Sequence, residues 1–297
     1  MSGGATTEQQ GLFRGALRTI VKMDWIVLAA AIWMTMVVVA AVVGEWIAPY
    51  DHAQQNIGVR NLAPGSPDGQ GGTHLLGTDL LGRDLLSRII AGARISLLVG
   101  ILSVGTAGLM GTVLGTLAGY VRGRTEAIVM RVVDIQMAIP FLLLALVFLF
   151  LFGRSLFNVV LILALLRWPV FARTARSLAL NLRTTEFVEA AGMLGYSHTR
   201  ILAKHMWPNM ASPLIALATL EIARLIIAEA TLSFLGLGVQ PPHTSWGRMI
   251  AQGRNNISSA SWNVVYPGLA ILFTAGSTNM LANWLREITD PLRKRSP

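Results

Sequence analysis

The 297-residue sequence contains no cysteine, and it is poor in charged residues and especially in lysine. The absence of cysteine excludes disulfide bonds, thiolate metal sites and a cysteine nucleophile. Lysine occurs only at Lys22, Lys204 and Lys294, and none of the three follows a glycine. A Walker A loop needs a Gly-Lys pair before Ser or Thr, because backbone amides and the lysine together hold the phosphates. The chain therefore cannot build that nucleotide site.

Charged side chains make up only 13% of the chain, whereas hydrophobic residues make up 53%. Soluble domains carry about twice that share of charge, and several apolar runs here reach the roughly 20 residues that a spanning helix requires. The formal net charge is +9, but the basic residues lie mostly beside the apolar runs, where they set topology and contact anionic lipid. We therefore predict an all-α polytopic membrane protein that does not bind nucleic acid.

The apolar runs predict about six transmembrane helices. The first covers residues 25–43, and the next three end near residues 120, 152 and 178; the fifth covers 213–237 and the sixth ends near residue 284. The predicted organisation is a cytoplasmic segment (1–24), the first span (25–43), an extracytoplasmic loop (44–94), a five-helix core (95–285) and a cytoplasmic tail (286–297). The core includes polar loops at 181–209 and 238–262.

Three local patterns refine this picture. Residues 76–96 repeat leucine and isoleucine at helical spacing and place Asp84 four residues before Arg88, which predicts an amphipathic helix at the membrane interface. Pro140 should kink or loosen the third span. Trp246 and Trp262 are expected at headgroup depth, and six glycines predict close helix packing along the second span: Gly100, Gly105, Gly108, Gly111, Gly115 and Gly119.

Basic residues are unequally divided between the two sides of the predicted bundle. When the loops are assigned alternately, one side holds both termini and the loop 181–209 and carries most of the arginines and all three lysines. The positive-inside rule places that side in the cytoplasm. Six spans with both termini cytoplasmic is therefore the predicted topology.

The loop 181–209 is too polar to span a membrane, yet it has a helical pattern. Glu186 and Glu189 stand in a first helical turn, where the helix dipole favours acids. An apolar face follows at Phe187, Ala190, Ala191 and Leu194. Gly195 suits a helix C-cap, Ser197 can cap a second short helix, and Pro208 is expected to end it. The pattern predicts a helix-turn-helix that docks a partner, with a solvated connector as the alternative.

The letters of this loop, EFVEAAGMLGYSHTRILAKHMWPN, resemble the "EAA" loop of binding-protein-dependent ABC import permeases. The matching positions are Glu189, Ala190, Ala191, Gly195, Ile201 and the Pro208-Asn209 pair. One departure is Gly192, where many members of that family carry a larger residue. Four further segments resemble the dipeptide, oligopeptide and nickel branch, and its second ("C") permease type in particular: residues 76–97, 134–140, 231–250 and 285–295.

This resemblance implies a type I ABC importer permease fold in a bacterial inner membrane. In such systems the EAA loop contains the coupling helix, which sits in a cleft of an ATP-binding subunit. The implied partners are a second permease in a heterodimer, two cytoplasmic ATP-binding subunits that hold ATP and Mg²⁺, and an extracytoplasmic solute-binding protein. The implied cargo is di- or oligopeptides, with nickel or another small solute as the alternative.

Functions of other classes require features that this sequence does not clearly show. A self-contained secondary transporter should show inverted internal repeats, and none is convincing. An intramembrane enzyme needs a catalytic cluster, and a receptor or scaffold would dock a partner without moving solute. The histidines are scattered without metal-ligand spacing: His52, His74, His198, His205 and His243. We therefore predict no catalytic, metal-binding or cofactor-binding residues.

Ionisable residues inside spans are costly and are therefore candidate functional residues. Glu221 and Arg224 are three residues apart and can pair on one helix face, with Glu229 further along the same span. Structural pairing is the favoured interpretation for them, and lining of the transport path is the alternative. Arg167 has no partner within a turn, so it either lines the path, snorkels or pairs across helices. Asp134 is expected to form a structural brace with Arg131.

Overall fold

The computed structural model describes residues 24–69 and 71–289. Of the predicted cytoplasmic segment 1–24 and tail 286–297, residues 1–23 and 290–297 lie outside the described residues. Five described helices are long and apolar enough to cross a membrane: α2 (Trp25–Ile47), α3 (Leu85–Val121), α6 (Leu156–Arg183), the segment His198–Phe234 that ends in α9, and α11 (Trp262–Thr289). The bent pair α4 (Gly123–Ala138) and α5 (Phe141–Phe152) makes six when it is counted as one broken span. The described residues thus match the predicted number of spans.

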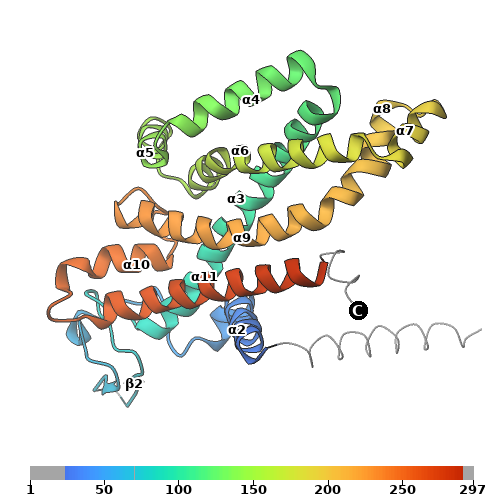
Figure 1. Ribbon diagram of the computed structural model, residues 1–297. Helices are drawn as coiled ribbons and strands as arrows, with labels where there is room; N and C mark the ends of the chain where they lie inside the picture. Colours follow the sequence, from blue (N-terminus) through green and yellow to red (C-terminus); the bar gives the residue numbers. More distant parts are fainter. Residues whose placement is uncertain (1–23, 70, 290–297) are drawn as a thin grey trace, which may run out of the picture.

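The short elements lie at opposite ends of the helix bundle (Figure 1). At one end, α7 (Glu186–Met193) and α8 (His198–Ile201) project beyond the long helices. At the other end lie α10 (Trp246–Gly253) and a small hairpin of β1 (Ser66–Pro67) and β2 (Thr73–His74), which pair antiparallel. The remaining described elements are three short helical turns: η1 (Ile57–Val59), η2 (Leu202–Met206) and η3 (Arg254–Asn256).

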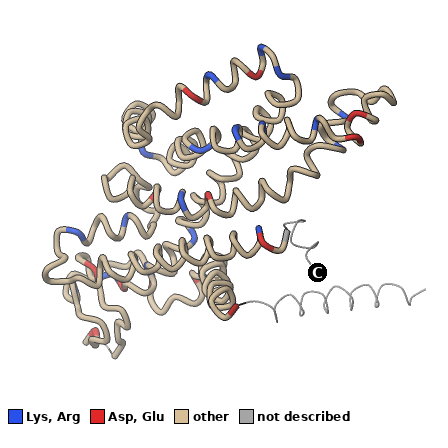
Figure 2. Tube along the Cα trace, viewed as in Figure 1, with Lys and Arg blue, Asp and Glu red and all other residues tan. Residues whose placement is uncertain are grey.

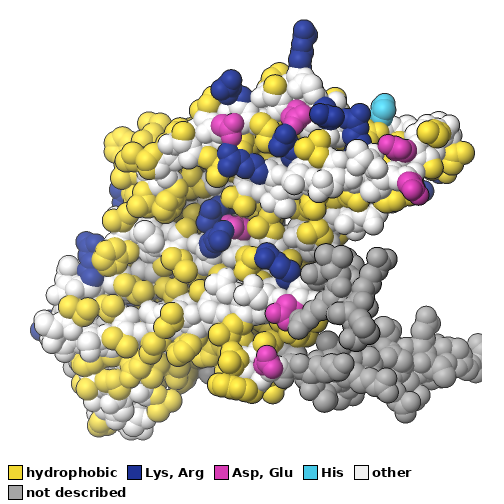
Figure 3. Space-filling view, viewed as in Figure 1, with side chains coloured by type: hydrophobic (Ala, Val, Ile, Leu, Met, Phe, Trp, Pro, Cys, Tyr) yellow, Lys and Arg dark blue, Asp and Glu magenta, His cyan; other side chains and the backbone are white. Residues whose placement is uncertain are grey.

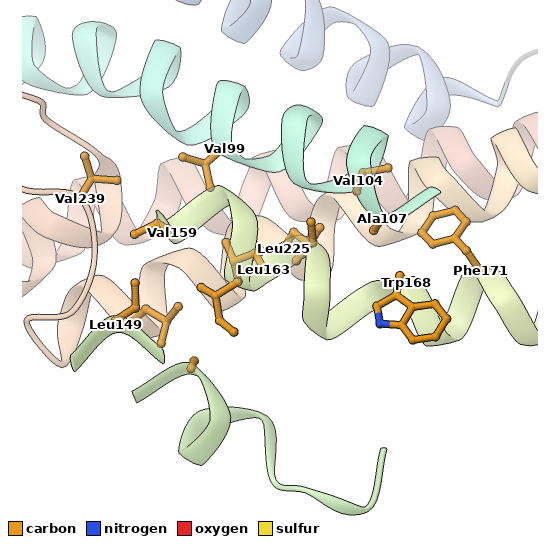
Figure 4. Close-up of a cluster of buried hydrophobic side chains, with 14 of the residues drawn as sticks. Val99, Val104, Ala107, Leu149, Val159, Leu163, Trp168, Phe171, Leu225 and Val239 are labelled. Atoms are coloured by element: carbon orange, nitrogen blue, oxygen red, sulfur yellow. The ribbon is translucent and has the colours of Figure 1, made fainter. Parts of the chain in front are cut away.

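The centre of the bundle is the contact between α3 and α6. A side chain at Gly111 or Gly115 would meet the backbone of Trp168 or Ala172, and a Cβ at Gly119 would lie 2.6 Å from the Arg176 carbonyl oxygen. Glycine every four residues therefore lets the two backbones touch, as the small-residue pattern predicted. A buried apolar cluster continues this contact toward α5 and α9, and Figure 4 shows Val99, Val104 and Ala107 of α3 on its upper side with Leu163, Trp168 and Phe171 of α6 below.

Two prolines shape the helices around that core. Pro140 ends α4, and α5 leaves at 92° to it, so the third span is broken rather than merely kinked. Pro169 lies inside α6 and has no N–H, which leaves the carbonyl of Leu165 without its helical partner. The amide of Gln136 on α4 donates to that carbonyl, and the indole of Trp168 donates to the Gln136 oxygen at 2.8 Å. The Gln136 side chain therefore supplies the hydrogen bond that Pro169 removes and connects α4 to α6.

The interfacial helix predicted for residues 76–96 is wrong. The chain turns until Asp84, whose carboxylate accepts from the backbone N–H of Ser87 at 2.8 Å and so begins α3, which continues unbroken to Val121. Asp84 does not pair with Arg88, because it caps the helix and contacts the Nδ1 of His74 at 2.9 Å. Arg88 is buried and instead pairs with Asp79 and donates to Gln252 at 2.8 Å. Tertiary contacts bury the face that the pattern assigned to water.

The loop 238–262 is more ordered than its composition predicted, because it contains α10 and η3. Trp246 was expected at headgroup depth, but it is only 1% exposed. Its backbone N–H donates to Ser96, and its indole donates to the carbonyl of Ile89 at 2.9 Å. Trp246 thus anchors α10 against the N-terminal part of α3.

Candidate functional site

The first turn of the helical hairpin, residues 185–206, agrees with the prediction from its sequence. Thr185 stands at the N-cap of α7, and Glu186 and Glu189 occupy the first turn, both exposed. Their negative charges face the positive end of the helix dipole, where they stabilise the short helix by a few tenths of a kcal/mol, up to about 1, each. The acidic first turn therefore stabilises the helix and remains accessible.

The tip of the hairpin is a Schellman turn centred on Gly195. Its φ is +77°, a conformation that glycine adopts without strain. The N–H of Tyr196 donates to the carbonyl of Ala191 at 3.1 Å, and the N–H of Gly195 donates to that of Gly192 at 3.0 Å. These two bonds satisfy the carbonyls left open at the end of α7. The expected role of Gly195 as a C-cap is confirmed.

Pro208 does not end a helix, contrary to the prediction. From Ser197 the chain enters α8, passes through the π-turn η2 and continues into α9 (Trp207–Phe234) as one helical segment from His198. Pro208 lies in the first turn of α9. The missing N–H of Pro208 costs little free energy, because the first N–H groups of a helix that follows a wide turn such as η2 lack regular α-helical partners. The second arm of the hairpin is therefore the rigid extension of a membrane span.

The hairpin has a buried side and an exposed tip. Val188, Ala191 and Met206 are buried with Ala175 and Ala179 of α6. The tip is made by exposed apolar side chains, with Met193 87% and Leu194 74% exposed; Figure 3 shows hydrophobic side chains beside acidic ones at this end. Of the residues in the predicted apolar face, Ala191 packs inward, whereas Phe187, Ala190 and Leu194 are exposed.

Side chains distant in the sequence fasten the hairpin to α3. The hydroxyl of Tyr120, in the last turn of α3, lies 2.8 Å from Nδ1 of His198. Arg183, the last residue of α6, donates to the backbone carbonyl of Tyr120 at 3.1 Å just before the hairpin begins. Within the hairpin, the Arg200 guanidinium covers the ring of Tyr196. The sequence pattern did not indicate Tyr120, since 78 residues separate it from His198. The hairpin thus has direct contact with two long helices.

Three of the candidate charged residues in spans form one group, which we call the charge triad: Glu221 and Arg224 on α9, and Arg167 on α6. Glu221 is fully buried on α9 and accepts from Arg224 Nη1 at 2.6 Å. Arg167 on α6 brings its Nε to 3.1 Å from the other carboxylate oxygen. The predicted Glu221–Arg224 pair is confirmed, and of the interpretations open for Arg167 the cross-helix pair is the one found.

The triad borders a cavity of about 440 Å³ between α5, α6 and α9. Arg167 and Arg224 both line it, and most of the other lining side chains are apolar, among them Phe141 and Leu225. In Figure 3, basic side chains flank an acidic one in the hollow between the part that carries α4–α6 and the part that carries α9. Small-molecule sites commonly combine apolar walls with a few polar groups in this way.

The remaining candidate residues are braces. Glu229 lies apart from the triad, is 1% exposed, and accepts from the hydroxyls of Ser233 at 2.6 Å and Ser245 at 2.8 Å. Asp134 pairs with Arg173 of α6 at 2.6 Å, so the prediction that Arg131 is its partner is wrong. A side chain on the neighbouring helix reaches it with better geometry than one on its own helix. Figure 2 shows that charged residues occur along α4 and near α7.

Residues 111–295 match the family described as "Binding-protein-dependent transport system inner membrane component". This chain belongs to that family. The match covers the charge triad and the whole hairpin. In the structure the hairpin lies between α6 and α9, the two helices that carry the triad.

Two relatives align with nearly the whole chain. The probable D,D-dipeptide transport system permease protein DdpC of Escherichia coli is 36% identical over 96% of this chain and 94% of its own length. The di/tripeptide transport system permease protein DppC of Pseudomonas aeruginosa is 39% identical over 91% and 89%. A chain of the MetNI methionine ABC transporter in an inward-facing conformation shares the fold, with a TM-score of 0.57 at 18% identity over 68% of this chain and 97% of that one.

Proposed function

We propose that this chain is a permease subunit of an ATP-driven ABC importer for di- or oligopeptides. The observation that carries the proposal is the exposed hairpin mounted on the end of a membrane span, in a chain that aligns over nearly its whole length with di- and tripeptide permeases. A docking surface at the end of a rigid helix transmits force into the membrane, which a solvated connector cannot do.

The hairpin is the proposed contact for an ATP-binding subunit. Its exposed acidic residues, Glu186 and Glu189, stand beside the exposed apolar tip at Met193 and Leu194. Apolar side chains at the centre of a patch with charges at its rim are the usual composition of a protein interface. The rest of the proposed coupling site holds this surface in shape: Ala190, Ala191, Gly195, Ile201 and Pro208.

The proposed complex contains a second permease as a heterodimer, two cytoplasmic ATP-binding subunits and an extracytoplasmic solute-binding protein. ATP and Mg²⁺ would be held by the ATP-binding subunits, and the present chain would supply no cofactor site. Both termini and the hairpin would face the cytoplasm of a bacterium, and the end with α10 and the β hairpin would face the binding protein.

In this arrangement the hairpin moves with the ATP-binding subunits. Because α8, η2 and α9 form one continuous helical segment, a displacement of the tip is carried along α9 to the charge triad. The Tyr120–His198 contact carries the same displacement to α3. Closure of the ATP-binding subunits would therefore open one end of the path and close the other, as alternating access requires.

The test is import by the complete complex. The chain, its neighbouring permease, ATP-binding subunits and binding protein are reconstituted in liposomes, and uptake of radiolabelled Ala-Ala-Ala with ATP inside or outside is measured. We expect import only when ATP reaches the ATP-binding subunits. Glu189→Arg should reduce both import and binding-protein-stimulated ATPase at least fivefold, because the charge reversal opposes a partner's basic contact.

Arg124→Gln, at the exposed start of α4 and outside the hairpin, is the control and should change neither quantity by more than about twofold. Unaltered uptake in the Glu189→Arg complex would count against the coupling role. Import of Ni²⁺ rather than peptide would redirect the substrate assignment while leaving the transport mechanism in place.

A further inference from the structure

The charge triad has one more positive charge than negative, since Arg167 and Arg224 face a single Glu221. Glu221 accepts one hydrogen bond from Arg224 through its Oε1, and its Oε2 forms an ion pair with Arg167 without a hydrogen bond. Each guanidinium has five N–H donors. Arg224 is 59% and Arg167 31% exposed, and both line the cavity. Among the residues that the structure describes, most of their donors therefore remain open beside an apolar-walled cavity.

The triad lies deep in the spans, where unpaired charge has a high free energy unless it faces water or a partner. Glu221 lies midway along α9, and Arg167 lies near the middle of α6. Charges at the middle of a span cost several kcal/mol in lipid and are found where they face a water-filled path or a partner. A purely structural pair would need one arginine for one glutamate, and the second arginine requires another explanation.

The broken third span adds to the positive field. Phe141, the first residue of α5, lines the same cavity. The first two N–H groups of α5 have no carbonyl partner in the helix, and the positive end of its dipole lies there. Discontinuous helices whose N-termini face a site at mid-depth are a recurrent way to hold the anionic group of a transported solute.

Resting on the proposed function, we propose that the charge triad and the start of α5 form a station in the transport path that binds the terminal carboxylate of the peptide in transit. Glu221 holds the two guanidinium groups apart and in place, and their open donors receive the carboxylate. The planar fork of arginine matches a carboxylate with two parallel hydrogen bonds. The apolar walls accept side chains without discrimination.

The cavity volume agrees with this occupant. About 440 Å³ holds a short peptide of two or three small residues, and drug-sized ligands occupy sites of roughly 300–1,000 Å³. Recognition of one end group combined with apolar walls would let one permease carry peptides of many sequences. The station therefore selects for a free carboxylate and tolerates variation in the side chains.

The experiment compares Ala-Ala-Ala with its C-terminal amide in the reconstituted complex. The binding protein is the same for every variant, so the ratio of acid to amide import, normalised to the wild type, reports the permease alone. Arg224→Gln should lower that ratio about tenfold, the effect of losing one charge-assisted hydrogen bond. Arg224→Lys, which keeps the charge, should restore it to within about threefold of the wild type.

Arg173→Gln is the control on the same helix as Arg167; its exposed pair with Asp134 lies outside the cavity, and the ratio should not change. An unchanged ratio in Arg224→Gln would overturn the proposal, as would an equal fall in Arg173→Gln. Loss of the second permease on purification of Arg224→Gln would also overturn it, by assigning Arg224 to a subunit interface. ATP-driven import of neither peptide by the wild type would refute the proposed function and this inference with it.

Discussion

Single buried polar residues determine how the loops attach to the spans. Glu229 joins α9 to the segment before α10, because its Oε1 accepts from both Ser233 and Ser245. Arg88 does the same for the segment before α3 through Asp79 and Gln252. In both places a long side chain satisfies groups that come from other parts of the chain.

At this scale we predict that Glu229→Leu destabilises the protein by about 2–4 kcal/mol, because both serine hydroxyls are left buried without an acceptor. Glu229→Gln keeps one carbonyl oxygen and should cost about half as much. Thermal unfolding of the detergent-solubilised complex measures the difference, and equal midpoints for the leucine variant and the wild type would contradict it. Ser259→Ala, at an exposed hydroxyl, is the control.

Helix packing depends on glycines that differ sharply in their surroundings. Gly115 lies against the carbonyl of Ala172, whereas no described atom lies within 4 Å of a Cβ added at Gly105. Both belong to the same helix and the same glycine-rich pattern. Sequence spacing predicted close contact for all six glycines. A described neighbour lies closer than ordinary van der Waals distance to an added Cβ at Gly100, Gly111, Gly115 and Gly119, at ordinary distance at Gly108, and beyond 4 Å at Gly105.

We therefore predict that Gly115→Val prevents α3 and α6 from packing and abolishes recovery of the folded complex. Gly105→Val changes the same residue type in the same helix and should leave recovery within about twofold of the wild type. Size-exclusion chromatography of the solubilised complexes distinguishes the two. A monodisperse Gly115→Val complex at normal yield would show that the helices can separate at that point without loss.

The orientation of the whole molecule across the membrane can be measured directly. The hairpin tip and the loop of η1 lie at opposite ends of the bundle, and Met193 is 87% and Ile57 69% exposed. The natural sequence has no cysteine. A single introduced cysteine is therefore the sole thiol in the chain and reports its own position.

We predict that Met193→Cys reacts with a membrane-impermeant maleimide only in inside-out vesicles, and Ile57→Cys only in intact spheroplasts. The positive-inside rule is the physical reason, since the basic loops remain with the hairpin on the cytoplasmic side. Labelling in the reverse pattern would invert the topology. Labelling of both from one side would mean that an odd number of spans does not separate them.

The sequence by itself determined the class of the molecule, the number of spans, the acidic first turn at Glu186 and Glu189, the cap at Gly195 and the Glu221–Arg224 pair. These features depend on composition or on neighbours within one helical turn. Tertiary structure decided the Arg167–Glu221 contact, the attachment of Tyr120 to His198, the burial of Trp246 and the continuation of the helix through Pro208. Each of these depends on a side chain or backbone group that only the packing of other helices supplies, and no local pattern in a single sequence encodes that neighbour.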